Sequence, residues 1–145
     1  MKSLRCAVRG LVPSVLLVLA TAGCAGDGAP THPTIPSTGP RPSSPATVEI
    51  VSPEPSTTVR GDTVHVVLRL NGGRIISDTT TSIRPDEGHV HLYVNNVLVS
   101  MNYGLEQDLP VQPGTTVLKA EFVAADHAPF SPRVWSAESV FTVTG

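Results

Sequence analysis

Two histidines, His89 and His91, stand one residue apart in the segment GHVHLYVNNVLVS, residues 88–100. Successive side chains of a β-strand point to opposite faces, so both imidazoles project from one face and the apolar residues from the other. A pair of imidazoles on one strand face is a common way to bind Cu(II) or Zn(II). The spacing therefore predicts a strand with one face in the core and the other displaying an imidazole pair.

Further side chains could complete such a metal site, and they are Glu121, Asp126 and His127. In an immunoglobulin-like arrangement the strand at 89–94 pairs with a strand at 115–124, which brings the glutamate close to the imidazole pair. The loop at 125–133, which carries the other two residues, reaches the same edge. Met101 could add a thioether for Cu(I). Copper is the first metal that this donor set predicts, and zinc is the second.

A structural role explains the same residues without a metal. Two histidines on an exposed strand can be plain solvated surface, and His127 could cap its loop through backbone hydrogen bonds. Glu121 opposite a histidine is also an ordinary cross-strand pair. The sequence leaves both interpretations open. His65 belongs to a different strand face, and we expect it to be structural or neutral.

Catalytic motifs are missing from the sequence. It has no Gly-rich phosphate loop, no Gly-X-Ser-X-Gly motif and no cysteine after Cys24 that could act as a nucleophile. We therefore expect a non-enzymatic protein with no catalytic residues.

Short β-strands are the elements that must position these residues. Alternation of apolar and polar residues, interrupted by turn residues, predicts strands over 47–51, 62–70, 75–76, 88–94 with its return to 100, 108–111, 115–124 and 137–143. Asn95-Asn96 is suited to the tight turn of a hairpin. About seven strands without a helical period predict an all-β, antiparallel two-sheet sandwich of the immunoglobulin type. A small barrel is the alternative.

The strand at 115–124 has a clear apolar face. Alternation directs Leu118, Ala120, Phe122 and Ala124 inward and leaves Lys119 and Glu121 outside.

The first 23 residues resemble a lipoprotein signal peptide. A basic start is followed by a short apolar run, 11–20, and by Thr21-Ala22-Gly23-Cys24. The run is too short to span a bilayer comfortably. We expect Cys24 to be lipidated and to anchor the chain in the membrane at the extracytoplasmic face. An ordinary signal peptide that leaves Cys24 as a free thiol is the alternative.

Residues 24–46 contain six prolines and many Ser, Thr and Gly residues, which predicts a disordered tether. The folded domain is then 47–145, and it contains no cysteine for a disulfide. From Cys24 onward, seven basic and twelve acidic residues give a net charge of −5 with His neutral. This balance, without a basic cluster, argues against a nucleic-acid partner.

The motifs GHVHLYVNN and AADHAPF, together with Leu109-Pro110 and Pro113-Gly114-Thr115, resemble a family of secreted bacterial β-sandwich domains. Its members read Gly-His-X-His-X-Tyr-Val-Asp-Gly and later Asp-His-Ala/Ser-Pro, and the match covers about 86–143. Asn95-Asn96 replaces the family's Asp-Gly. The chain is also loosely similar to small extracytoplasmic copper-binding sandwiches, and this similarity implies metal binding.

Two functions follow as expectations. The first is a non-enzymatic lipoprotein of the cell envelope, whose sandwich is a binding or accessory module for an envelope protein or polymer. The second is an extracytoplasmic copper or zinc domain that uses His89, His91 and His127, with Glu121 or Asp126 completing the coordination.

Overall fold

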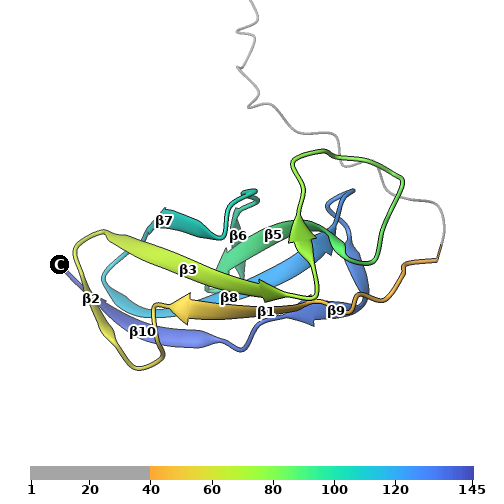
Figure 1. The fold of residues 1–145 in the computed structure, drawn as a ribbon. Coiled ribbons are helices and arrows are strands. Elements are labelled where there is room, and N and C mark those ends of the chain that lie inside the picture. Colours follow the sequence, from red (N-terminus) through yellow and green to blue (C-terminus); the bar gives the residue numbers. More distant parts are fainter. Residues whose placement is uncertain (1–39) are drawn as a thin grey trace, which may run out of the picture. The chain divides into compact units, whose positions relative to one another are not determined.

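The computed structural model describes residues 40–145, and this part of the chain is all β (Figure 1). The signal peptide, Cys24 and the tether up to residue 39 lie outside the described residues. The strands are β1 Thr47–Ser52, β2 Thr58–Arg60, β3 Thr63–Asn71, β4 Arg74–Ile75, β5 Glu87–Val94, β6 Val97–Ser100, β7 Glu106–Pro110, β8 Gly114–Ala124, β9 Pro129–Trp135 and β10 Ser139–Thr144. The predicted all-β class is thus confirmed.

The strands form two sheets. The smaller sheet has the order β1-β3-β7, and the larger has the order β2-β10-β8-β5-β4, with β6 beside β5 and β9 beside β8. Figure 1 shows β1 and β3 running over β8 and β10. Within 40–145, no helix is long and apolar enough to cross a membrane.

Strand β8 organises the larger sheet. It pairs antiparallel with β5 along one side, and with β10 and then β9 along the other. The register sets His89 opposite Val123 and His91 opposite Glu121, so Glu121 does lie close to the histidine pair, as the sequence predicted. The turn after β5 also follows the prediction, because both Asn95 and Asn96 have positive φ angles, of 49° and 66°.

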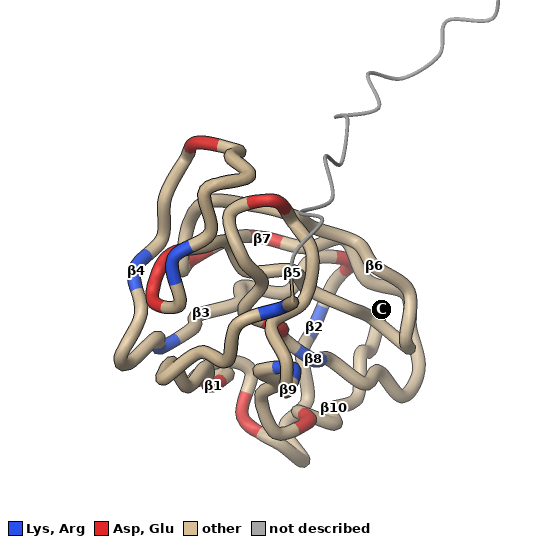
Figure 2. The backbone as a smooth tube through the Cα atoms, turned by 90° about the vertical axis from the view of Figure 1, so that its right-hand side faces the viewer, with Lys and Arg blue, Asp and Glu red and all other residues tan. Residues whose placement is uncertain are grey.

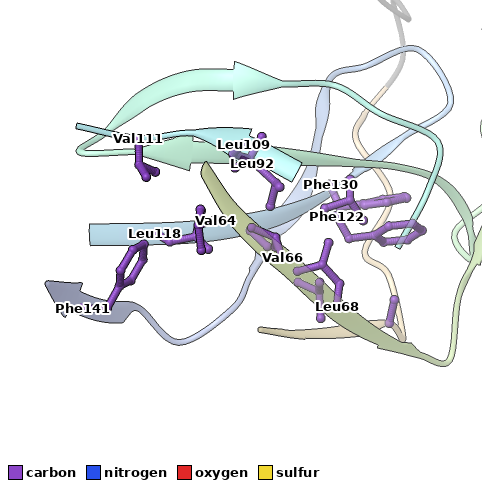
Figure 3. Close-up of a cluster of buried hydrophobic side chains, with 14 of the residues drawn as sticks. Val64, Val66, Leu68, Leu92, Leu109, Val111, Leu118, Phe122, Phe130 and Phe141 are labelled. Carbon is purple, nitrogen blue, oxygen red and sulfur yellow. The ribbon is translucent and has the colours of Figure 1, made fainter. Parts of the chain in front are cut away.

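The core fills the space between the two sheets (Figure 3). Val64, Val66 and Leu68 come from β3, and the predicted inward residues of β8 meet them, with Leu118, Ala120, Phe122 and Ala124 all fully buried. Phe122 stacks on Phe130 with the ring centroids 5.5 Å apart. Alternation along these strands is sufficient to explain the core.

Two strands were missed by the sequence predictions. Residues 125–133 were expected to be a loop, but Pro129–Trp135 form β9. This strand pairs only with β8, so its prolines need not donate to a second neighbour, and an edge position tolerates them. The three-residue strand β2 was not predicted, because it is too short to show alternation. The described residues therefore contain ten strands instead of about seven.

Candidate functional site: an imidazole cluster

Three histidines from two separate segments gather at the first half of β5. His89 and His127 stack, with ring centroids 4.2 Å apart and planes inclined by 21°. His91 stacks on the same His127 ring at 5.5 Å and 18°. The loop after β8 carries His127 over the two strand histidines, as the sequence predicted. We call these three residues the imidazole cluster.

The imidazole cluster is buried, so the prediction that the strand pair is displayed was wrong. His89 is fully buried and His91 is 5% exposed. Other side chains shield the two rings from solvent. His127 stacks on both of them, and Tyr103 packs edge-on against His89 with the ring centroids 4.9 Å apart. His127 is partly exposed, so the cluster meets solvent at this ring.

Gly88 allows β5 to lie this close to β8. A Cβ atom at residue 88 would stand 1.8 Å from the carbonyl oxygen of Val123, which no side chain can tolerate. The glycine that precedes His89 is therefore required by the close approach of the two strands.

His89 is held in one tautomer by the backbone. Its Nε2 lies 3.2 Å from the carbonyl oxygen of Ala125, and because a carbonyl only accepts, Nε2 must carry the proton. In the neutral ring Nδ1 is then unprotonated. This buried Nδ1 has no hydrogen-bond partner within the described residues.

His91 and His127 meet through their ring nitrogens. The Nε2 atom of His91 is 3.3 Å from Nδ1 of His127, and Nε2 of His127 is 3.2 Å from Oγ1 of Thr79. Burial, followed by the charges of His127, His89 and Arg133, lowers the pKa of His91 from 6.5 to about 4. His91 is therefore neutral near pH 7 and keeps a nitrogen lone pair.

Glu121 is opposite His91, but Arg133 binds its carboxylate. Arg133 donates from Nε to Oε1 at 2.6 Å and from a terminal nitrogen to Oε2 at 2.7 Å. The Tyr93 hydroxyl donates to Oε2 at 3.1 Å. The guanidinium of Arg133 also lies over the ring of Trp135, with its central carbon 4.5 Å from the ring centroid. These partners bury Glu121 completely, although it was expected to be outside.

Asp126 is also fully buried and ion-paired. The Arg41 guanidinium donates to both of its carboxylate oxygens, at 2.6 and 3.0 Å. The carboxylates of Glu121 and Asp126 are thus each bound by an arginine, whereas the three imidazoles contact one another. His65 pairs with Asp108 on the smaller sheet, at 2.7 Å, and stays apart from the cluster as expected. Met101 is 46% exposed after β6.

Across residues 40–145, no group of three or more His, Cys, Asp or Glu side chains is arranged to hold a metal ion. What the described geometry provides is an adjacent pair of imidazole nitrogens, on His91 and His127, with a third ring stacked beside them.

Several residues around the cluster were missed by the sequence predictions, and they are Arg41, Thr79, Tyr93, Tyr103 and Arg133. The sequence gives one indication that Arg41 is special, because it is the only Lys or Arg in the segment 25–46. The others lie in loops or on strand faces where the sequence gives no indication of their neighbours. Residues 41–46, assigned to the tether, contact the sandwich through Arg41, the Pro42 carbonyl and the buried Ala46.

No protein-family model matches the chain, and no curated protein sequence matches it. Among solved structures, it is similar to an endo-β-1,4-mannanase from Thermotoga petrophila, with a TM-score of 0.45 and 14% identity over 69% of this chain. The chain spans 20% of the length of that mannanase chain. Fibronectin(III)-like modules of Clostridium thermocellum CbhA give a TM-score of 0.39 and 10% identity, over 67% of this chain and 93% of theirs.

Proposed function

We propose that this chain is a non-enzymatic binding module of the cell envelope, and that the imidazole cluster binds copper or zinc. The module is an immunoglobulin-like sandwich, held at the extracytoplasmic face of the membrane by a lipid on Cys24. The observation that carries the proposal is the 3.3 Å separation between Nε2 of His91 and Nδ1 of His127.

The separation suits two ligands of one ion. Imidazole nitrogens lie about 2.0–2.1 Å from Zn(II), and two such ligands at the tetrahedral angle are then about 3.3 Å apart. The low pKa of His91 supports the same role, because only a neutral imidazole can ligate. A hydrogen bond between the two rings accounts for the distance equally well when no metal is bound.

The surroundings of the rings also fit a metal site. Metal-binding histidines usually donate the N–H of their other ring nitrogen to a carboxylate, a backbone carbonyl or a water molecule, which fixes the ring orientation. His89 has such a partner in the Ala125 carbonyl, and the Nε2 atom of His127 is held by the hydroxyl of Thr79 instead. His91 and His127 would hold the ion, and His89 brings a third imidazole, whose buried Nδ1 has no hydrogen-bond partner within the described residues.

Glu121 and Asp126, which the sequence suggested as further ligands, are not ligands in this proposal. Each carboxylate is already bound at two points by an arginine, and breaking a buried ion pair costs about 3–5 kcal/mol. The same ion pairs support a non-enzymatic role, because neither carboxylate is available as a general base or a nucleophile.

Electron paramagnetic resonance of the Cu(II)-loaded chain tests this proposal. Coordination by His91 and His127 predicts splitting of the copper signal by at least two imidazole nitrogens, and the splitting should diminish in His91→Ala. His65→Ala is the matched control, because His65 lies on the other sheet, and its spectrum should equal that of the wild type. A copper spectrum without nitrogen splitting contradicts the proposal.

A second candidate function, binding of an envelope protein or polymer, is favoured by strand β6. This edge strand contains no charged residue, and Val97, Leu98 and Val99 are 63%, 41% and 46% exposed. In Figure 2 the backbone at β6 is drawn in tan, without a charged position. An uncharged, exposed edge strand is a surface on which a partner strand can pair.

Site-specific photocrosslinking separates this second candidate from the first. A photoreactive residue at Leu98 should capture one recurring envelope partner, and excess unlabelled chain should compete with it. Val140 is the matched control, since it is 40% exposed and lies on β10. Equal capture from both positions contradicts a specific β6 surface.

A further inference from the structure

The loop that carries His127 has a strained backbone at that residue. His127 has a φ angle of 62°, a left-handed conformation that costs a non-glycine residue free energy unless its surroundings hold it. Two backbone hydrogen bonds close the turn: the His127 amide donates to the Ala124 carbonyl, and the Ala124 amide donates to the Ala128 carbonyl. The Ala128 amide also donates to a carboxylate oxygen of Asp126, at 3.1 Å.

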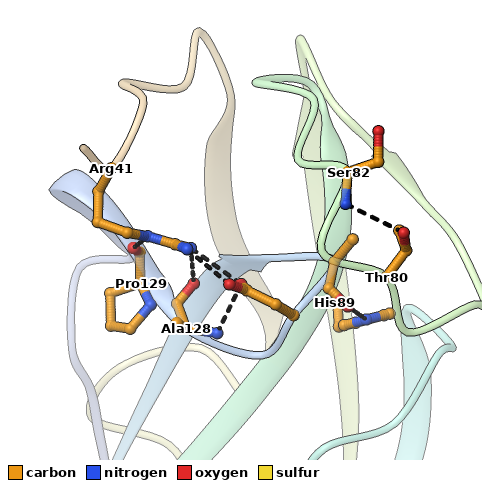
Figure 4. A network of polar contacts seen from close by, with 8 residues as sticks. Arg41, Thr80, Ser82, His89, Ala128 and Pro129 are labelled. Carbon is orange, nitrogen blue, oxygen red and sulfur yellow. Dashed lines mark hydrogen bonds and ion pairs between the residues drawn. The ribbon is translucent and has the colours of Figure 1, made fainter. Parts of the chain in front are cut away.

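Arg41 binds residues that precede and follow His127 in the sequence, and Figure 4 shows its guanidinium beside Ala128 and Pro129. On the preceding side its guanidinium donates to both oxygens of Asp126. On the following side it donates to the carbonyl of Ala128 at 2.8 Å and, from Nε, to the carbonyl of Pro129 at 2.8 Å. One side chain therefore fixes residues 126, 128 and 129 relative to one another.

Only an arginine can make this set of contacts. The planar fork of a guanidinium offers donors at Nε and at both terminal nitrogens, and all three are used here. A lysine would keep the positive charge beside Asp126 but would lose the fixed geometry of the fork. The two functions of Arg41, charge compensation and geometry, can therefore be separated experimentally.

We propose that Arg41 is a positioning residue that holds His127 over His89 and His91. Because Arg41 comes from the segment that precedes the first strand, the imidazole cluster depends on the chain immediately outside the sandwich. A chain that begins at residue 47 would lack this contact. The inference rests on the proposed function only in treating the imidazole cluster as the binding site.

The test compares Arg41→Lys with the wild type in the full processed chain in detergent micelles, by NMR of the ring nitrogens and ring protons without metal. We expect Arg41→Lys to lose the proton contact between the His89 and His127 rings and to shift the ring nitrogens of His127. Amide signals of β1 and β3 should stay in place. Arg69→Lys is the control, because Arg69 and its partner Glu49 are both more than half exposed, and it should leave the rings unchanged.

A folded Arg41→Lys variant with unchanged ring signals overturns the proposal. If Arg41→Lys does not fold, the double variant Arg41→Gln/Asp126→Asn removes both charges and decides the question. A folded double variant with the ring contact intact contradicts the proposal, and one without the contact supports it. A double variant that also fails to fold assigns Arg41 a general structural role and overturns the proposal too.

Metal titration then separates this inference from the proposed function. Replacement of a residue that orients a metal-binding histidine typically lowers the metal affinity by roughly 10- to 100-fold. We expect the Cu(II) affinity of Arg41→Lys to fall by a factor in this range. A wild type that keeps the ring contact but binds no metal contradicts only the proposed function. Equal affinity in both chains, with the ring contact intact, contradicts only the positioning role.

Discussion

The Nε2 atom of His91 lies 3.3 Å from the Nδ1 atom of His127, although 36 residues separate the two histidines in the sequence. The contact exists because β5 and β8 pair in register and the chain turns back immediately after β8. The proposed binding site is thus a consequence of strand register and of one tight turn.

Replacing Phe122 by alanine should destabilise the domain by about 3–5 kcal/mol, because a fully buried aromatic ring is removed from the centre of the core and leaves a cavity. Denaturant unfolding followed by circular dichroism measures this loss. Val140→Ala is the control, since its side chain is 40% exposed, and it should change the free energy of unfolding by about 0.5 kcal/mol or less. Equal effects of the two substitutions would contradict the core assignment.

Removal of the Arg133 side chain should destabilise the domain more than its half-exposed position suggests. Arg133→Ala leaves the fully buried carboxylate of Glu121 without its cation, which should cost roughly 3 kcal/mol, the low end for breaking a buried pair, because Arg133 is half-exposed. Arg69→Ala is the matched control: Arg69 and its partner Glu49 are both more than half exposed, so the loss should stay below about 1 kcal/mol. Chemical denaturation of both variants measures the difference, and similar losses would contradict this account of Glu121.

Acid should destabilise the domain through His91. The pKa of His91 is about 4 in the folded chain and 6.5 in the reference state, so between these values the unfolded chain binds a proton that the folded chain does not. The free energy of unfolding therefore falls as the pH falls through this window, by up to about 1.4 kcal/mol per pH unit from this group. Below about pH 4 both states are protonated and the contribution no longer changes.

Comparison of wild type with His91→Gln isolates this effect from other titrating groups. The free energy of unfolding, measured at several values between pH 4 and 7, should depend less steeply on pH in the variant. Parallel curves for the two chains would show that His91 does not titrate with a lowered pKa.

Much of the fold was predictable because alternation acts locally. The residues of β3, β5 and β8 alternate in polarity, and this is sufficient to predict the strands and the core face of β8. The hairpin turn was predictable because Asn tolerates positive φ angles. Each of these features depends on residues close together in the sequence.

The burial of the imidazole cluster was not predictable in the same way. It depends on Tyr103, on His127 and on the ion pair between Arg41 and Asp126, which joins positions 85 residues apart. No periodic pattern marks such a pair, and the prolines around Arg41 indicated a tether. The burial of Glu121 has a similar cause. The Arg133 side chain that shields it comes from β9, a strand that was not predicted because its prolines indicated a loop.

Anchoring through Cys24 predicts that metabolic labelling with a fatty-acid analogue marks the wild-type chain and fails to mark Cys24→Ser. Cys6→Ser is the matched control, because Cys6 lies in the predicted signal peptide and its removal should leave the label on the mature chain. Label on Cys24→Ser at the wild-type level would contradict the lipid anchor.

Calorimetric titration of the metal-free chain with Cu(II) and Zn(II) at pH 7 tests the proposed metal site most directly. We expect saturable binding of one ion per chain, tighter for Cu(II) than for Zn(II), because copper has the highest affinity among the divalent metals for a given nitrogen site. His91→Ala should lose most of the affinity, and His65→Ala should bind like the wild type. Dissociation constants weaker than about 100 μM for both metals, or equal affinities for the wild type and His91→Ala, would contradict the metal site.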